Sequence, residues 1–460
     1  AKIPSLLVLD GLDEIGAEED RKRIVEAIRD LISSFAKQSA RATIVATTRP
    51  QGYMGELEAI GAPLVTRYLS RLSTKEALHY AFKLLDERIK GPEEQEKRKT
   101  QLRAAAEESA TARLLQTPLQ VTILAALVQE GNVPNERWRL FENYLRIVYQ
   151  REVERSIAAS ELLKSRKNQV ELIHARAALL LQVEAEASGG ASSKMPKERF
   201  VSIVDQVLQE EGIDDEKRAD LVERIVKVAE TRLVFLVEPE PGYFGFEIRS
   251  LQEFMAAWAL VVDGKESQVE ARILQIAKAP LFRNVLLFMA SKIYGGSSSL
   301  RDFVAKTACV KLNEDPSDIL TQTTKAGALL ALEILEEGAV LPSARYAREL
   351  MLRATELLDL PPYEVHPRLV RAINGDTEKV FIEAIEKRIQ DKSSKQAVTS
   401  WLCLVEAGNF GHAWATRIAD AHWAGMQFPN EILKACWFAD VVPSDWLVAK
   451  INESPGNFDP

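Results

Sequence analysis

Two short apolar runs near the beginning of the sequence constrain its fold more than any other feature. Residues 3–9 (IPSLLVL) and 42–46 (ATIVA) are apolar without polar alternation, which is typical of strands buried on both faces of a parallel sheet. Between them, residues 18–35 carry apolar side chains at helical spacing, for example Ile24 and Ile28. The order strand, helix, strand predicts part of a parallel α/β sheet.

Acidic residues and an arginine stand just beyond these predicted strands. Asp10 ends the first run, Asp13 and Glu14 come shortly after it, and Arg49 follows the second run. Ligands of open α/β sheets bind beyond the carboxyl ends of the strands. A carboxylate there can hold Mg²⁺ beside nucleotide phosphates, further carboxylates can orient or deprotonate a water, and an arginine can neutralise phosphate charge. We favour this nucleotide site over the simpler interpretation, in which Asp13 and Glu14 cap a helix and Arg49 lies on the surface.

Length and charge exclude some classes of protein. The chain has 460 residues, enough for about three domains. Its 59 Lys and Arg against 67 Asp and Glu give a net charge of −8, so nucleic acid is not an expected partner. No apolar run reaches the roughly 18 residues of a membrane span, and no signal-peptide pattern begins the sequence. We expect a cytoplasmic protein with no membrane partner.

Cysteine and histidine spacing gives no sign of a metal cluster. Cys309, Cys403 and Cys436 are far apart with no C-x-x-C pattern, and the five histidines form no H-x-x-H pair. Neither a disulfide framework nor a metal held by protein side chains alone is predicted.

The segments LLVLDGLDE (residues 6–14) and ATIVATTRP (residues 42–50) resemble the Walker B and sensor 1 segments of NACHT-type ATPases. These ATPases belong to the STAND class of signal-transduction P-loop NTPases. The resemblance implies that Asp10 serves Mg²⁺, that Asp13 and Glu14 serve hydrolysis, and that Arg49 is the sensor arginine. It extends over about residues 1–290.

A second segment of the resemblance lies at residues 114–120 (LLQTPLQ), which open an apolar helix. They look like the "NPLLL" segment of the small helical domain in NACHT proteins. This likeness implies that Pro118 packs near the adenine of the nucleotide. The alternative is a proline that simply occupies the first turn of a helix.

The third segment resembles a NACHT winged helix. Residues 232–237, an EPEPG turn and residues 243–246 predict a β-hairpin. The following RSLQEFMAA (residues 249–257) is similar to the signature H-x-S-F-Q-E-F-x-A-A, which closes these domains. The family's frequent histidine, which contacts the nucleotide β-phosphate, falls at Ile248 here. Because isoleucine cannot hydrogen-bond a phosphate, the ADP-bound lock depends on whether a register shifted by one residue gives that role to Arg249.

No Walker A motif is present. The single Gly-Lys pair, Gly264-Lys265, has Ala259 and Glu266 at the positions of the first glycine and the Ser or Thr. In NACHT proteins the phosphate-binding loop precedes Walker B. We therefore expect the chain to be a fragment that is inactive alone, whereas its intact parent is an ATPase.

We predict a mainly α protein with a partial α/β P-loop NTPase sheet. The expected domains are the second half of the nucleotide-binding domain (1–69), a small helical domain (70–131), a winged helix (132–262) and a helical region or solenoid (263–460).

Further expectations are a strand over 63–69, an exposed loop or helix end over 91–103, and a loop over 188–196. Helices are predicted over 325–339, 344–358 and 378–389. Late tryptophans, which include Trp401 and Trp446, are either core spacers or a ligand-sensing surface.

The function implied by the resemblance is an ATP-dependent signal-transduction switch. A trigger bound by the C-terminal helical region would drive exchange of ADP for ATP and self-oligomerisation, in innate immunity, cell death or prokaryotic antiphage defence. The expected cofactors are ATP or ADP with Mg²⁺. The alternative is a non-enzymatic helical scaffold with a degenerate NTPase remnant. A winged-helix transcription regulator is disfavoured by the acidic charge and by Gln252 and Glu253 on the closing helix.

Overall fold

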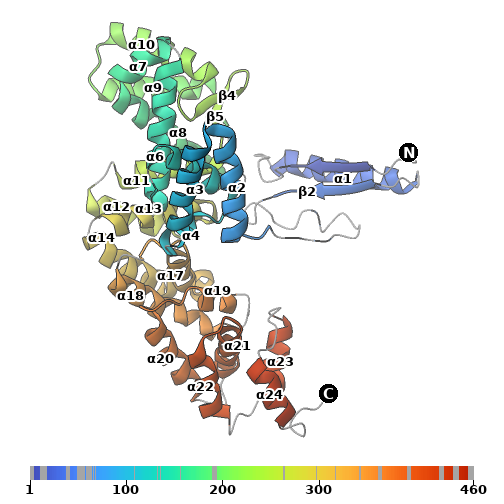
Figure 1. Cartoon of the computed structure of the whole chain (residues 1–460). Helices are drawn as coiled ribbons and strands as arrows, with labels where there is room; N and C mark the ends of the chain where they lie inside the picture. The colour runs from blue at the N-terminus through green and yellow to red at the C-terminus, as the bar shows by residue number, and fades with distance from the viewer. Residues whose placement is uncertain are drawn as a thin grey trace. The chain divides into compact units, whose positions relative to one another are not determined.

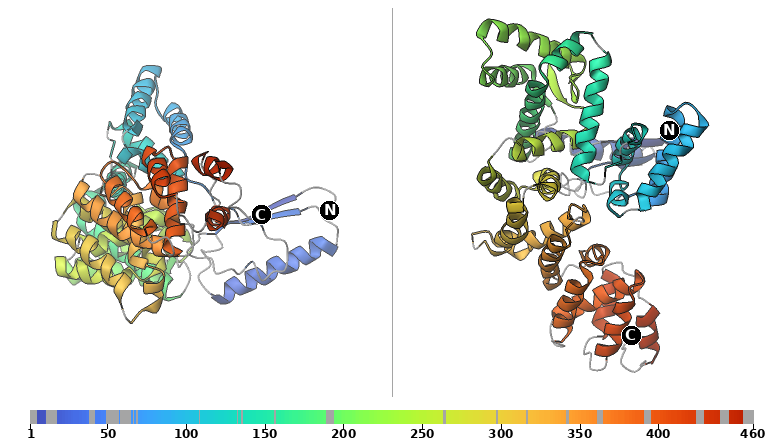
Figure 2. Two further views of the ribbon diagram at one scale, coloured as in Figure 1. Left: turned by 90° about the horizontal axis from the view of Figure 1, so that it is seen from below. Right: turned by 60° about the vertical axis from the view of Figure 1, so that its left-hand side comes forward.

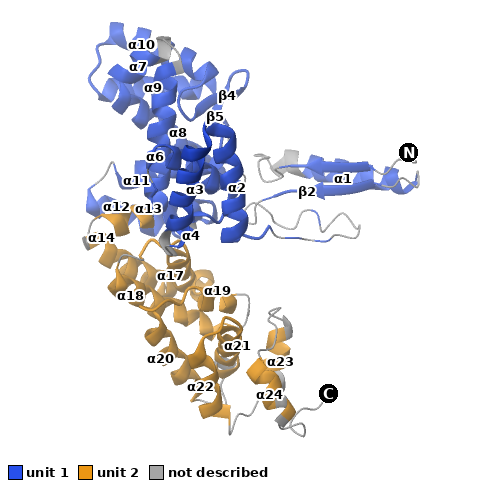
Figure 3. Cartoon of the chain, in the orientation of Figure 1, with its two compact units in different colours: residues 1–289 blue, residues 290–460 orange. Residues whose placement is uncertain are grey.

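The computed structural model is mainly helical, with a two-stranded and a three-stranded sheet (Figure 1). The structure describes residues 5–10, 18–37, 42–48, 57, 65, 67, 69–107, 109–131, 133–134, 136–155, 157–188, 194–262, 265–296, 298–315, 317–340, 343–360, 365–390, 395–423, 429–438 and 445–453. The chain divides into two compact units, residues 1–289 and 290–460 (Figure 3).

The first strand, helix and second strand form where the sequence predicts them. They are β1 (Ser5–Leu9), α1 (Glu18–Lys37) and β2 (Ala42–Ala46). β1 and β2 pair in parallel, from Ser5 opposite Ala42 to Leu9 opposite Ala46. The predicted parallel α/β arrangement is therefore confirmed for this part of the chain.

The predicted burial of this sheet on both faces is wrong. Leu6, Val8 and Val45 lie on one face and are 66%, 55% and 42% exposed. The opposite face is half-buried, and Val25 and Ile28 of α1 are buried. A parallel sheet needs helices on both faces, and in the described part of the chain only one face is covered.

The strand expected over residues 63–69 is also wrong where the structure describes it. Residues 65, 67 and 69 lie outside any strand, and Val65 and Leu69 are 69% and 102% exposed. Among the described strands, β1 and β2 form a sheet of two, and residues 65, 67 and 69 add no third strand to it. The rest of the segment lies outside the described residues.

Four helices follow. They are α2 (Thr74–Arg88), α3 (Pro92–Glu107), α4 (Ser109–Leu114) and α5 (Pro118–Gln129). α2 begins with a capping box, in which the Glu76 amide donates to Ser73 Oγ and the Ser73 amide donates to Glu76 Oε2. α5 is apolar around most of its circumference and is buried from Ile123 to Val128, as a central helix must be.

Of residues 91–103, expected as an exposed loop or helix end, all but Gly91 belong to the regular helix α3. The charged composition of this segment concealed its contacts with neighbouring helices. Leu102 is fully buried, and Gln95 Nε2 donates to the carbonyl oxygens of Asp86 and Ile89 at 3.1 and 2.9 Å. The Arg103 guanidinium lies 5.1 Å from the centroid of the Phe82 ring.

The remaining elements of the first unit alternate helices with short strands. They are α6 (Arg137–Arg155), α7 (Ile157–Ser165), α8 (Lys167–Ala187), β3 (Lys194–Pro196), α9 (Lys197–Glu210), α10 (Asp215–Thr231), β4 (Leu236–Glu240), β5 (Tyr243–Phe246), α11 (Arg249–Val261), α12 (Glu266–Ile276), the 3₁₀ turn η4 (Pro280–Phe282) and α13 (Arg283–Gly295), which runs into the second unit.

The predicted hairpin is confirmed as β4 and β5, which pair in antiparallel fashion. Its first strand begins at Leu236, later than expected, because Leu233 and Leu236 exchange backbone hydrogen bonds across a turn in which Val234 has a φ of 56°. The loop expected over 188–196 is wrong at its end. Residues Lys194–Pro196 form β3, which pairs with β5 and completes the sheet order β3-β5-β4.

An aromatic cluster forms the core between α6, α11 and α13. The Phe254 ring centroid lies 4.9 Å from that of Trp138, 5.7 Å from that of Phe141 and 5.6 Å from that of Phe288. The Arg137 guanidinium lies 4.1 Å from the Phe288 ring centroid. These contacts fix α6 and α13 against α11.

Residues 290–460 are helical throughout their described ranges (Figure 2). The elements are α14 (Ser298–Asp302), the π-helical turn η5 (Phe303–Ala308), α15 (Cys309–Glu314), α16 (Ile319–Thr323), α17 (Ala326–Glu336), α18 (Ala344–Ala354), the 3₁₀ turn η6 (Thr355–Asp359), α19 (His366–Arg371), α20 (Glu378–Ile389), α21 (Lys395–Asn409), α22 (Ala413–Trp423), α23 (Pro429–Phe438) and α24 (Asp445–Glu453). The helices predicted within 325–339, 344–358 and 378–389 are confirmed.

The late tryptophans whose side chains the structure describes pack inside the second unit. The Trp401 ring centroid lies 5.8 Å from that of Trp423 and 6.0 Å from that of Trp446. Trp401 and Trp414 are 4% and 5% exposed. This geometry favours the core-spacer interpretation over a ligand-sensing surface at these positions.

We expect Trp401→Ala to lower the free energy of unfolding by about 3 kcal/mol or more, because it removes a buried indole and its contacts with two neighbouring rings. Urea denaturation followed by far-ultraviolet circular dichroism measures the loss. Leu352→Ala is the control, since Leu352 is 47% exposed on α18 of the same unit and its truncation should cost less than about 1 kcal/mol. Equal effects of the two substitutions would contradict the core assignment.

Candidate functional site

Parallel pairing of β1 and β2 brings Asp10 and Thr47 together at the carboxyl ends of the two strands. The Thr47 amide donates to the Leu9 carbonyl oxygen at 2.9 Å, which continues the ladder by one residue. The Thr47 hydroxyl donates to Asp10 Oδ1. The Asp10 carboxylate is thereby oriented by its neighbour while it remains exposed to solvent.

This pair has the chemistry of a partial magnesium site. Carboxylate, hydroxyl and water oxygens are ligands that Mg²⁺ accepts, and Mg²⁺ is often held by one or two carboxylates together with phosphate oxygens and water. Within the described ranges, no group of three or more His, Cys, Asp and Glu side chains could hold a metal ion.

Asp13, Glu14 and Arg49 lie outside the described residues, so their predicted roles stay predictions. Thr47 received no role from the sequence. The pairing register of the two strands is the signal that would have identified it. Leu9 is opposite Ala46, so the residues that follow them, Asp10 and Thr47, are neighbours.

Pro118 is the first residue of α5, and Thr117 is the N-cap. The Gln120 amide donates to Thr117 Oγ1 at 3.3 Å, and Thr117 Oγ1 donates to Gln120 Oε1 at 2.9 Å. These contacts account for the proline as a helix start, where its fixed φ and missing N–H are tolerated. The exposed ring remains available for a planar ligand.

The backbone next to Pro118 is held by the segment before α2. The Leu72 amide donates to the Gln116 carbonyl oxygen at 2.9 Å, and the Arg71 guanidinium donates to Gln116 Oε1. These bonds join the starts of α2 and α5. The structure thus brings Thr47 to Asp10 and places Pro118 beside the hydrogen bonds that join the starts of α2 and α5.

Ile248 and Arg249 begin the closing helix α11. Ile248 is the N-cap residue, and its side chain makes no capping hydrogen bond. Arg249 Nε lies 3.4 Å from Glu253 Oε1, with both side chains 10% or less exposed. Asn284 Nδ2 donates to Glu253 Oε2 at 3.2 Å. Arg249 therefore has an internal partner, which gives no support to a phosphate contact in a register shifted by one residue.

Gln252, the other polar residue noted on this helix, is also internal. Gln252 Nε2 donates to Gln182 Oε1 at 3.2 Å, and Gln182 Nε2 donates to the Leu281 carbonyl oxygen at 2.5 Å. The Leu281 amide donates to Glu186 Oε2 at 3.0 Å. Gln182 and Glu186, one turn apart on α8, thus bind the carbonyl oxygen and the amide of Leu281. Through its bond to Gln182, Gln252 belongs to this core network.

Two histidines are buried and serve the core. His174 Nδ1 and Nε2 each lie 2.7 Å from a carbonyl oxygen, that of Val170 and that of Leu233. Burial lowers the pKa of His174, because desolvation disfavours the charged imidazolium. Burial likewise lowers the pKa of His366 to about 4. Both side chains are inaccessible to an external ligand.

The lowered pKa of His366 predicts a loss of stability in acid. Between the ordinary pKa of 6.5 and about 4, the unfolded chain binds a proton that the folded chain excludes. The free energy of unfolding should therefore be constant for this group above pH 6.5 and fall by about 2 kcal/mol by pH 5. Urea denaturation at pH 7 and pH 5 measures the difference.

In the same experiment, His366→Asn should reduce the difference between pH 7 and pH 5, whatever its cost at pH 7. His79→Asn is the matched control at an exposed position and should leave the difference unchanged. An identical pH dependence in the wild type and in His366→Asn would refute a buried neutral His366.

No protein-family model matches the chain, and no curated protein matches it significantly. None of the helices within the described ranges combines the length and apolar character required to cross a bilayer.

Proposed function

We propose that the chain is the carboxyl portion of an ATP-dependent signal-transduction switch of the NACHT and STAND type. The observation that carries this proposal is the contact between Asp10 and Thr47 at the carboxyl ends of two paired parallel strands. That edge is where open α/β sheets bind their ligands. It also presents an exposed carboxylate at the position that the Walker B resemblance gives to the magnesium ligand.

In this proposal each predicted site residue has one role. Asp10 serves Mg²⁺, Asp13 and Glu14 position and activate the attacking water, and Arg49 senses the γ-phosphate. Pro118 contacts the adenine. The phosphate-binding loop, which cradles the phosphates through backbone amides and a lysine, does not occur within the 460 residues, so this chain alone is expected not to hydrolyse ATP.

The order of elements in residues 167–246 supports a winged helix. It reads helix, strand, helix, helix, strand, strand, and the three strands lie in the order β3-β5-β4. The hairpin β4–β5 occupies the place of the wing. α11 follows it directly, as the closing helix of a NACHT winged helix would.

The switch would use ADP and ATP to select between closed and open states. A nucleotide changes such an equilibrium only if it binds the two states with different affinities, and the same holds for the trigger. We assign trigger recognition to the helices of residues 290–460. Exchange of ADP for ATP would then permit association with further copies of the protein, in immunity, cell death or antiphage defence.

The first experiment is to read the coding sequence upstream of Ala1 and to express the protein with the segment it encodes. If a G-x-x-x-x-G-K-[ST] motif lies there between a strand and a helix, we expect Glu14→Gln to slow ATP hydrolysis by about 100-fold, because it removes the group that activates water. ATP affinity, measured by calorimetry, should change by less than about threefold, since the binding groups remain.

Glu26→Gln on the exposed face of α1 is the matched control and should leave turnover unchanged. Unchanged turnover in Glu14→Gln would remove Glu14 from the mechanism. An initiator codon immediately before Ala1 would overturn the ATPase switch as a whole.

One observation favours a second candidate, a non-enzymatic helical scaffold with a remnant of an NTPase sheet. Ile248 stands at the position of the phosphate-contacting histidine, and Arg249 pairs with Glu253 inside the protein. Asp10→Asn distinguishes the two candidates. It should weaken Mg²⁺-dependent ATP binding by the extended protein if the switch is correct, and it should have no such effect in a scaffold.

A further inference from the structure

Two departures from regular backbone geometry and one unusually close contact between helices lie near one another in the second unit. Residues Phe303–Ala308 form a π-helical turn inside the helical segment 298–314, and the Cys309 amide donates to the Val304 carbonyl oxygen, five residues earlier. Lys325 adopts a left-handed conformation with a φ of 50°. A Cβ atom on Gly327 would lie 1.8 Å from the Cys309 carbonyl oxygen, so no side chain fits there.

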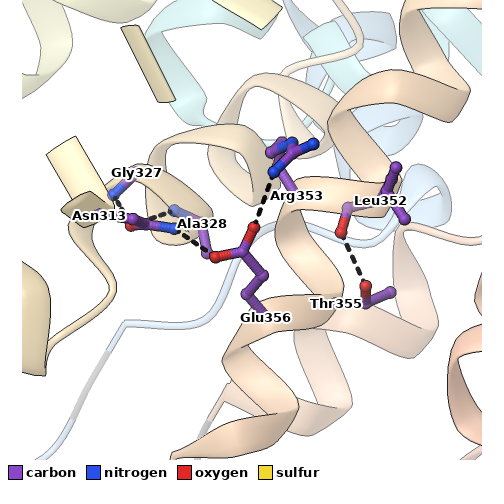
Figure 4. A network of polar contacts seen from close by, with 7 residues as sticks. All are labelled: Asn313, Gly327, Ala328, Leu352, Arg353, Thr355 and Glu356. Carbon is purple, nitrogen blue, oxygen red and sulfur yellow. Dashed lines mark hydrogen bonds and ion pairs between the residues drawn. The ribbon is translucent and has the colours of Figure 1, made fainter. Parts of the chain in front are cut away.

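The side chain of Asn313, on the helix that follows the π turn, contacts the start of α17 and η6 (Figure 4). Its Oδ1 accepts hydrogen bonds from the amides of Gly327 and Ala328 at 2.8 and 3.2 Å. Its Nδ2 donates to Glu356 Oε2 at 2.7 Å. The Arg353 guanidinium in turn lies 3.2 Å from Glu356 Oε1. Asn313 thereby joins α15 to the start of α17 and to η6.

These contacts provide hydrogen-bond partners, from a side chain of another helix, for the backbone amides at the start of α17. The N-cap residue Lys325 offers no side-chain hydrogen bond, and the first amides of a helix have no partner within it. Asn313 is 6% exposed, and Gly327 is buried, so water cannot easily replace the amide side chain. The left-handed Lys325 and the closely packed Gly327 both lie next to these Asn313 hydrogen bonds.

The π turn sets which residue of the segment faces α17. A π turn holds more residues than an α turn, and each residue of an α-helix is rotated by about 100° from the previous one. A change from π to α geometry would therefore rotate Cys309 and Asn313 relative to the helix that precedes them. Asn313 would then leave α17, and the constraint on Gly327 would be lost with it.

We propose that residues 298–314 and the first turn of α17 form a two-state joint, in which the Asn313 hydrogen bonds hold the π register against an undocked α register. Strained backbone is often found at segments that switch. Here Asn313 lies on the helix that directly follows the π turn, and it binds the helix start that directly follows the left-handed Lys325. The proposal is independent of nucleotide binding, because all the groups involved lie within residues 290–460.

Hydrogen exchange measured by mass spectrometry on the whole chain tests the joint. In Asn313→Ala, amide protection should fall about tenfold or more in both residues 303–309 and residues 327–330, because the two segments undock together. Protection in α20 (Glu378–Ile389) of the same unit should not change. A loss confined to residues 327–330 would make Asn313 a simple cap, and no loss in either segment would also overturn the proposal.

If Asn313→Ala does not fold, Glu356→Ala provides the same test. It removes the carboxylate that orients the Asn313 amide and leaves Asn313 in place. The proposal requires a smaller but parallel loss of protection in residues 303–309 and 327–330. Loss in only one of them, or in neither, would overturn it.

Deletion of Lys306 tests the register itself, because Lys306 is the exposed residue of the π turn. A chain lacking it should form a continuous α-helix with Asn313 still docked, so protection should rise in residues 303–312 and persist in residues 327–330. Lys306→Ala is the matched control, since it loses only the ion pair with Asp302 at 3.3 Å, and it should leave both segments unchanged. Loss of protection throughout residues 290–460 in the deletion variant would contradict a two-state joint.

Discussion

The structure depends on hydrogen-bond partners for the backbone amides and carbonyl oxygens at the ends of many short helices. Every helix leaves amides at its start and carbonyl oxygens at its end without partners inside it. At several helix ends a polar side chain of a neighbouring helix supplies a partner. Gln95 binds the last carbonyl oxygens of α2, Gln101 binds that of Gly131 beyond α5, and Thr399 binds that of Leu358 in η6. The apolar faces provide most of the free energy of packing, whereas these polar contacts stabilise the particular helix ends at which they occur.

Periodicity was sufficient to predict much of this fold. The apolar runs at residues 3–9 and 42–46 contain β1 and β2, and α20 has the predicted bounds of 378–389. Local patterns succeed in these places because the pairing or packing of each element follows from its own side chains. The hairpin at residues 236–246 likewise follows from a local turn signal.

The failures involve contacts that a segment makes outside its own element. Residues 91–103 are polar enough to be taken for a loop, but Gln95 binds the Asp86 carbonyl oxygen of α2 and Leu102 is fully buried. β3 is short and exists because β5, almost 50 residues later, pairs with it. The contact of Thr47 with Asp10 needed the register of two strands. Of the candidate site, sequence could therefore propose the chemistry of Asp10 and the helix start at Pro118, whereas the partner of Asp10 required the fold.

The open face of the β1–β2 pair has a consequence for handling the protein. Leu6, Val8 and Val45 present apolar surface to solvent, and within the described residues each strand has one edge without a neighbour. Such an edge is a template for further strands, and native proteins usually cover or charge it. The exposed apolar side chains of this strand pair therefore favour self-association in concentrated solutions of the protein.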